Sequence, residues 1–94
     1  MEELIDVLVS GNHSLVVDNG EIRTFDGRGV SDLYRMLVQD PGFLDRARIA
    51  DKVVGKGAAA LMILGGVNEV YAGVISDPAF ALFEKSEVKV SFGK

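Results

Sequence analysis

The 94-residue chain contains no cysteine and a single histidine, His13. The absence of cysteine excludes disulfide bonds, thiolate nucleophiles and zinc sites built from cysteine. Zinc in proteins is held by three or four side chains, so one histidine does not make a zinc site. We therefore expect no bound metal and no cofactor. In its turn between a helix and a strand, His13 is best interpreted as a structural hydrogen-bonding residue, the alternative being an acid or base.

Positive charge and long apolar runs are also scarce. The chain has 10 Lys and Arg against 14 Asp and Glu, for a net charge of −4. This balance argues against nucleic acid as the main partner. No apolar run is long enough to span a membrane, and the acidic start Met1-Glu2-Glu3 is unlike a signal peptide. We expect a cytoplasmic protein that has neither nucleic acid nor membrane as a partner.

Hydrophobic residues, in contrast, are abundant for so short a chain. They make up 48% of the residues, and the mean hydropathy is +0.23. The length suits one domain with one core, spanning residues 1–94, and no linker or repeat divides it. A small domain this apolar often buries part of its surface against a second copy. We therefore expect a homo-oligomer, most simply a two-fold dimer.

The first half of the chain predicts a helix, a hairpin and a second helix. Acidic residues favour a helix start at residue 2, and Gly11-Asn12 closes that helix. Asn19-Gly20 favours a two-residue type I′ turn between β-rich runs. Such a turn pairs Val17 with Ile22 and Leu15 with Thr24, and turns Val16 to the other face. Ser31 is expected to cap the second helix, which ends at Gln39. That helix is predicted to bury Leu33, Tyr34, Leu37 and Val38.

The second half alternates strands and helices. Asp77 is expected to cap the last helix, with Pro78 at its first position, and Val88, Val90 and Phe92 are expected to face inward on the last strand. The order α-β-β-α-β-α-β-α-β predicts an α/β protein with a largely parallel β-α-β-α-β portion and right-handed crossovers. The predicted elements are strand 49–54, helix 57–64, strand 69–76, helix 77–85 and strand 87–92.

A hairpin followed by β-α-β-α-β is the plan of the cytidine-deaminase-like fold, a three-layer α-β-α sandwich around a five-stranded mixed sheet. The segments NHSLVVDNGEIRTFDGRGVSDLY, ADKVVGKGAAALMILGGV, EVYAGVIS and VKVSF closely resemble an uncharacterised family of small prokaryotic proteins with that fold, a domain of unknown function. The resemblance covers nearly the whole chain. Members of that family continue into a cysteine-containing C-terminal segment. The resemblance therefore implies a short natural form or a truncation.

The zinc motifs of true deaminases are missing. Those enzymes open one helix with H-A-E or C-A-E and the next with P-C-x-x-C, which together hold zinc and activate water. The matching positions read Gly57-Ala58-Ala59 and Pro78-Ala79-Phe80-Ala81-Leu82. The proline is retained, whereas the metal ligands and the glutamate are absent. We expect no zinc-dependent deamination.

Gly55, Lys56 and Gly57 form the strongest candidate site. They lead into an all-apolar helix, which we expect to be buried, and a helix N-terminus offers free N–H groups and a positive dipole end. In open α/β sheets, ligands bind beyond the carboxyl ends of the strands, where this helix start and the one at Pro78 should converge. The segment is not a Walker A motif. A small anionic or nucleotide-like metabolite fits this pattern. Equally, the glycines could serve tight packing while Lys56 is solvated.

Asp51, Lys52 and Arg28 are further candidates. On a buried strand, Asp51 and Lys52 point to opposite faces, and a desolvated Lys52 could act as a base or amine nucleophile. The favoured alternative is that one of them caps or pairs with Arg46, Arg48 or the Arg28 loop. Arg28 offers a planar fork to a carboxylate or phosphate, although its loop could simply join two elements.

Two classes of function therefore compete, with the question of enzymatic activity left open. The preferred one is a module that binds a small anionic metabolite in a metal-free deaminase-like cleft. The alternative is an oligomeric interaction or structural module in which that cleft is vestigial. An enzyme that uses Lys52 and Asp51 is a third and less favoured interpretation.

Overall fold

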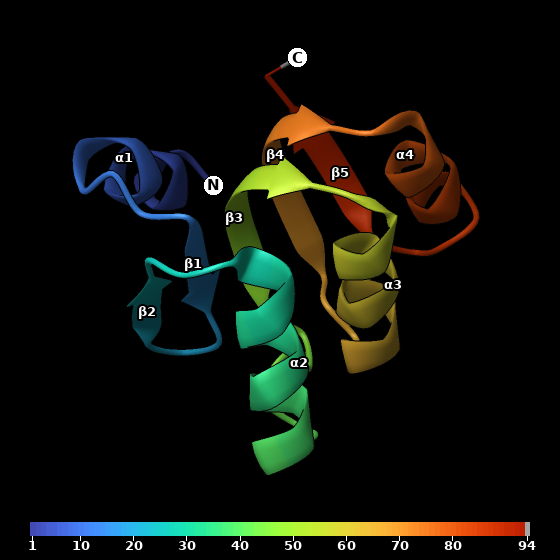
Figure 1. Cartoon of the computed structure of the whole chain (residues 1–94), viewed down its shortest axis with the longest axis horizontal. Coiled ribbons are helices and arrows are strands. Elements are labelled where there is room, and N and C mark those ends of the chain that lie inside the picture. Colours follow the sequence, from blue (N-terminus) through green and yellow to red (C-terminus); the bar gives the residue numbers. More distant parts are fainter. Residues whose placement is uncertain (94) are drawn as a thin grey trace.

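The computed structural model describes residues 1–93 and contains four helices and five strands in the predicted order (Figure 1). The first helix has the bounds expected from the sequence. The other boundaries differ from the expected ones by at most two residues, except that α2 begins three residues earlier than a cap at Ser31 implies. The elements are α1 Glu2–Ser10, β1 Leu15–Asp18, β2 Ile22–Phe25, α2 Gly29–Gln39, β3 Arg48–Val54, α3 Lys56–Gly65, β4 Glu69–Ile75, α4 Asp77–Glu84 and β5 Lys89–Phe92.

The strands form one mixed sheet in the order β2-β1-β3-β4-β5. Strand β1 is antiparallel to both of its neighbours, whereas β3, β4 and β5 are parallel to one another. Parallel neighbours need crossover connections, and α3 and α4 supply them. The predicted five-stranded mixed sheet is confirmed.

Apolar clusters lie on both faces of this sheet. Alternation along β1 sends Leu15 and Val17 into the larger cluster, which also contains Leu33 of α2, Met62 of α3 and Phe83 of α4. The smaller cluster joins α1 to the opposite face through Leu4, Leu8, Val16 and Ala50. Helix α1 therefore covers one face, over β1 and β3, and the other three helices cover the second face. No helix within residues 1–93 combines the length and apolarity that crossing a membrane requires.

The hairpin differs from the predicted one by one residue of register. Leu15 pairs with Phe25 and Asp18 with Ile22, so three residues form the loop where two were expected. Gly20 takes a positive φ of 109°, and Asp18 Oδ1 accepts a hydrogen bond from its N–H at 3.1 Å. Asn19 instead donates through Nδ2 to the Phe43 carbonyl at 3.1 Å, a distant contact that local turn preferences do not include. As a consequence, Phe25 replaces Thr24 on the Leu15 face.

Helices α2 and α3 bury less of their surface than their apolar patterns predict. Leu33 is buried and Leu37 half-buried, but Tyr34 is 62% and Val38 64% exposed, which contradicts their assignment to the core. Leu64 of α3 is 81% exposed, although that helix has no polar face. The reason is that both helices lie in an outer layer, and no element within residues 1–93 covers their outward sides.

Two helix starts also differ from expectation. Helix α2 begins at Gly29 with Arg28 in the N-cap position, so Ser31 lies inside the helix and does not cap it. Helix α4 is capped by Ser76, whose Oγ accepts a hydrogen bond from the Ala79 N–H at 3.2 Å, while Asp77 is the first helical residue.

On β5, Phe92 is partly exposed and packs edge-on against Phe80, with ring centroids 5.5 Å apart.

Candidate functional site

Two helices begin side by side at the carboxyl edge of the parallel strands. Strand β3 ends at Val54 and leads through Gly55 into α3, and β4 ends at Ile75 and leads through Ser76 into α4. The Ser76 N–H donates to the Val54 carbonyl at 3.1 Å, which joins the two connections. The predicted convergence of helix starts is confirmed.

Helix α2 begins at the same end of the helical layer. A Cβ added at Gly57 would lie 3.6 Å from Val30 in the first turn of α2. Arg28 directly precedes that turn and is exposed. The fold therefore brings Arg28 to the same end of the layer as Gly55, Lys56 and Gly57.

The start of α3 is open to solvent. No side chain caps it, Lys56 is exposed, and Lys56 forms no ion pair with any residue of the range 1–93. Gly55 has an extended backbone that any residue adopts, and a Cβ added there would meet nothing within 4 Å. At Gly57 the added Cβ would make only an ordinary contact. Tight packing therefore does not explain these glycines.

Asp51 is a buried carboxyl in the middle of the sheet. It is 2% exposed and pairs laterally with Leu15 of β1 and Ala72 of β4. Its Oδ1 accepts a hydrogen bond from the Val53 N–H at 3.3 Å, whereas its Oδ2 has no partner within the described residues. Burial raises the pKa of Asp51 to about 7, although hydrogen bonds from the backbone of Val53 and Lys52 oppose that rise.

Lys52 lies on the other face of the sheet and is exposed, so its predicted burial is wrong. Its Nζ donates to Asn12 Oδ1 at 3.2 Å, beside the end of α1. This position removes the desolvation that would activate Lys52 as a base or nucleophile. Asp51 does not pair with an arginine either. Arg48 instead donates to Asp18 at 2.6 Å, which lowers the pKa of Asp18.

Asp32 is a buried carboxyl that sequence reasoning missed. It is 7% exposed, and Arg35 donates to its Oδ1 at 2.8 Å. Its Oδ2 has no partner within the described residues and lies 3.2 Å from the position of a Cβ added at Gly27. An acid in the first turn of a helix, three residues before an arginine, is typical of a solvated surface, so the sequence carried no signal of burial.

His13 has the structural role expected from the sequence. Its Nδ1 lies 2.6 Å from Asp26 Oδ1 and joins the turn before β1 to the loop after β2. Ser14 reinforces this junction by donating from Oγ to the Gly27 carbonyl at 2.7 Å. Within residues 1–93, no group of three or more His, Cys, Asp or Glu side chains is placed to hold a metal ion.

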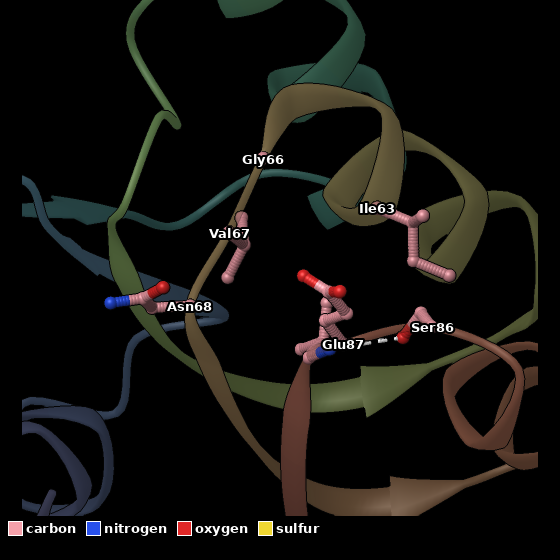
Figure 2. Close-up of a pocket in the computed structure, with 7 residues that line it drawn as sticks. Ile63, Gly66, Val67, Asn68, Ser86 and Glu87 are labelled. Atoms are coloured by element: carbon pink, nitrogen blue, oxygen red, sulfur yellow. Dashed lines mark hydrogen bonds between the residues drawn. The ribbon is translucent and has the colours of Figure 1, made fainter.

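A cavity of about 360 Å³ lies at the opposite edge of the sheet, where α3 ends and β4 begins (Figure 2). The Glu87 carboxylate extends into it, which makes it a poor site for an anion. No sequence motif indicates this cavity, because its walls come from the end of α3, the turn into β4 and the segment before β5. The lining residues are Ile63, Gly66, Val67, Asn68, Ser86, Glu87 and Val88.

Residues 3–94 match a family described as a domain of unknown function, DUF1893 (TM1506). The chain belongs to the DUF1893 family. This membership confirms the resemblance to an uncharacterised family, and no curated protein matches the chain.

A solved structure has the same fold. The crystal structure of a DUF1893 family protein (TM1506) from Thermotoga maritima superposes on 98% of this chain with a TM-score of 0.86 and 22% sequence identity. At this identity, the likeness establishes a shared fold. The chain covers 63% of that protein's length, which is less than two thirds.

Proposed function

We propose that this DUF1893 protein is a cytoplasmic binding module for a small anionic or nucleotide-like metabolite. The proposed site is a metal-free cleft of a cytidine-deaminase-like three-layer sandwich, at the carboxyl edge of β3 and β4. The antiparallel β1, the parallel β3-β4-β5 and the helices on both faces support this assignment.

The observation that carries the proposal is the open start of α3. Its first N–H groups have no side-chain cap, and Lys56 adds an exposed positive charge beside them. The free space around Gly55 allows a phosphate or carboxylate to approach the backbone closely. Arg28, at the same end of the layer, supplies a second cation.

Asp51 is the proposed contact for the polar, uncharged part of the metabolite. The Val53 hydrogen bond directs its carboxyl group toward the carboxyl end of β3, and the buried Oδ2 has no partner within the described residues, so a polar group of a ligand that reached it would supply one. With a pKa of about 7, the neutral and ionised forms coexist near neutral pH, so the group both donates and accepts hydrogen bonds. A nucleobase or a sugar hydroxyl offers the matching groups.

Thermal unfolding with a panel of inorganic phosphate, nucleoside monophosphates and dicarboxylates tests the proposal. A ligand at a hundredfold excess over its Kd adds about 2.7 kcal/mol to the free energy of unfolding, a clear rise in Tm. For the ligand that gives the largest rise, Lys56→Ala should weaken affinity about ten- to a hundredfold in calorimetry.

Lys89→Ala is the matched control, because Lys89 lies at the opposite edge of the sheet and should leave affinity unchanged. The proposal fails if no compound in the panel raises Tm at millimolar concentration. Unchanged affinity in Lys56→Ala would also contradict it.

The absence of zinc chemistry is a separate prediction. Gly57-Ala58-Ala59 opens α3 where deaminases carry a metal ligand and a glutamate. Protein purified without a histidine tag should therefore contain no stoichiometric zinc and should not deaminate cytidine. Metal analysis that finds one zinc per chain would overturn this prediction.

A further inference from the structure

Helices α2 and α3 present a continuous apolar surface to solvent, which we call the α2–α3 face. On α2 it consists of Val30, Tyr34 and Val38, which follow one another at a spacing of four residues. On α3 it consists of the exposed residues Gly57, Ala60 and Leu64.

The two stripes lie beside each other along helices that run in the same direction. Gly57 adjoins Val30 where the helices begin. Near the other end, a Cβ added at Gly65 would lie 3.2 Å from Leu37. Figure 1 shows the two helices side by side. An exposed apolar patch of this kind marks an interaction surface.

The charges at the two ends of the α2–α3 face are opposite in sign. Arg28 and Lys56 stand at the helix starts, neither start has a capping side chain, and Asp32 in the first turn of α2 is paired with Arg35. Asp40 forms the C-cap of α2, and Asp45 lies next to Gly66, the C-cap of α3. Arg46, whose N–H donates to the Gly66 carbonyl, also lies at that end. The net charge is therefore one negative there and two positive at the starts, where Asp32 and Arg35 cancel each other.

This arrangement is unfavourable within one chain. A helix start attracts negative charge and a helix end attracts positive charge, whereas the start of α3 and the ends of both helices carry the opposite sign. A second copy of the chain removes the mismatch if its helices run antiparallel to those of the first. Each basic end then faces an acidic end, whereas a parallel arrangement would bring like charges together.

We infer that the α2–α3 face is the interface of a two-fold homodimer in which the helices of the two copies run antiparallel. The small side chains of Gly57 and Ala60 allow the helices to approach closely, while Leu64, Tyr34 and Val38 fill the contact. Lys56 of each copy faces Asp45 of the other. This inference does not depend on the proposed metabolite.

Sedimentation velocity at micromolar concentration tests the interface. The unaltered chain should sediment as a dimer and Leu64→Arg as a monomer, with an unchanged circular dichroism spectrum because Leu64 is already 81% exposed. Val9→Arg is the control, since Val9 is 70% exposed on α1, on the other side of the sheet, and that variant should remain a dimer. If Leu64→Arg is misfolded, Val38→Arg replaces it.

Charge reversal tests the antiparallel arrangement. Lys56→Asp and Asp45→Lys should each weaken self-association by about tenfold or more, because each homodimer would contain two like-charge contacts. An equimolar mixture of the two variants should recover dimerisation, since both contacts of the heterodimer are then between opposite charges. A monomeric unaltered chain, a dimeric Leu64→Arg, or a mixture that stays monomeric would overturn the inference.

Discussion

Asp51 links the buried centre of the sheet to solution pH. The folded protein retains the Asp51 proton up to a pH of about 7, whereas the unfolded chain releases it near the ordinary pKa of 3.8. Between these values the folded state binds more protons, so the free energy of unfolding should fall as pH rises from 4 to 7. The loss should be on the order of 4 kcal/mol.

Asp51→Asn removes the titrating group and keeps its shape. The variant should unfold at a higher Tm than the unaltered chain at pH 8 and at nearly the same Tm at pH 4. Asp6→Asn, at an exposed site on α1, should show neither effect. Thermal unfolding monitored by circular dichroism across this range gives the answer, and a difference independent of pH would contradict the raised pKa.

For some residues the sequence alone indicates whether the side chain is buried. For others, contacts with residues distant in the sequence determine its burial. Alternation along β3 correctly placed Asp51 and Lys52 on opposite faces. It could not indicate that α1 leaves Lys52 open to solvent. The helical pattern likewise could not indicate that Asp32 is buried beside Gly27 and Arg35. Both outcomes depend on how separate elements pack together, which local patterns do not encode.

At the scale of elements, the start of α4 offers two neighbouring candidates for the N-cap, Ser76 and Asp77, and substitution of each tests which one caps the helix. Ser76→Ala removes the hydrogen bond to the Ala79 N–H and should lower the free energy of unfolding by about 1 kcal/mol. Asp77→Ala removes only a charge near the helix start and should cost less, about 0.3–1 kcal/mol. Urea denaturation of both variants ranks them, and a larger loss in Asp77→Ala would restore the assignment from sequence.

Two glycines in adjoining elements should respond in opposite ways to alanine. A Cβ at Gly73 in β4 would lie 2.7 Å from the Lys52 backbone oxygen, so Gly73→Ala should destabilise the protein by about 1–3 kcal/mol. At Gly57 the added Cβ has room, and Gly57→Ala should raise stability by up to about 1 kcal/mol through helix propensity. Urea denaturation at a concentration where the association state is known makes the comparison, and a stable Gly73→Ala would exclude the close contact.

The order of elements was predictable because each has a strong local signal, such as the acidic start of α1, the Gly-rich entry to α3 and Pro78 at the start of α4. Local signals fail where a distant group competes for the same atoms. The hairpin shows this, since Asn19 bonds to Phe43 across the fold and the loop gains a residue.

For the whole molecule, the sequence predicted the sheet and the edge at which helix starts gather, because chain order and crossover handedness largely determine both. It did not predict which apolar residues stay exposed. The periodicity of α2 and α3 gives a wide apolar surface, but only the packed structure distinguishes the side that meets the sheet from the side that remains free.

Lys56 belongs both to the proposed anion site and to the basic end of the α2–α3 face. Because of this double position, anion binding and dimerisation affect each other reciprocally. An anion bound at Lys56 competes with Asp45 of a second copy, so each factor by which it weakens dimerisation is the factor by which dimerisation weakens anion binding. The concentration of the metabolite would then determine how much of the protein is monomer and how much is dimer. Sedimentation of the unaltered chain across a phosphate titration measures this coupling directly.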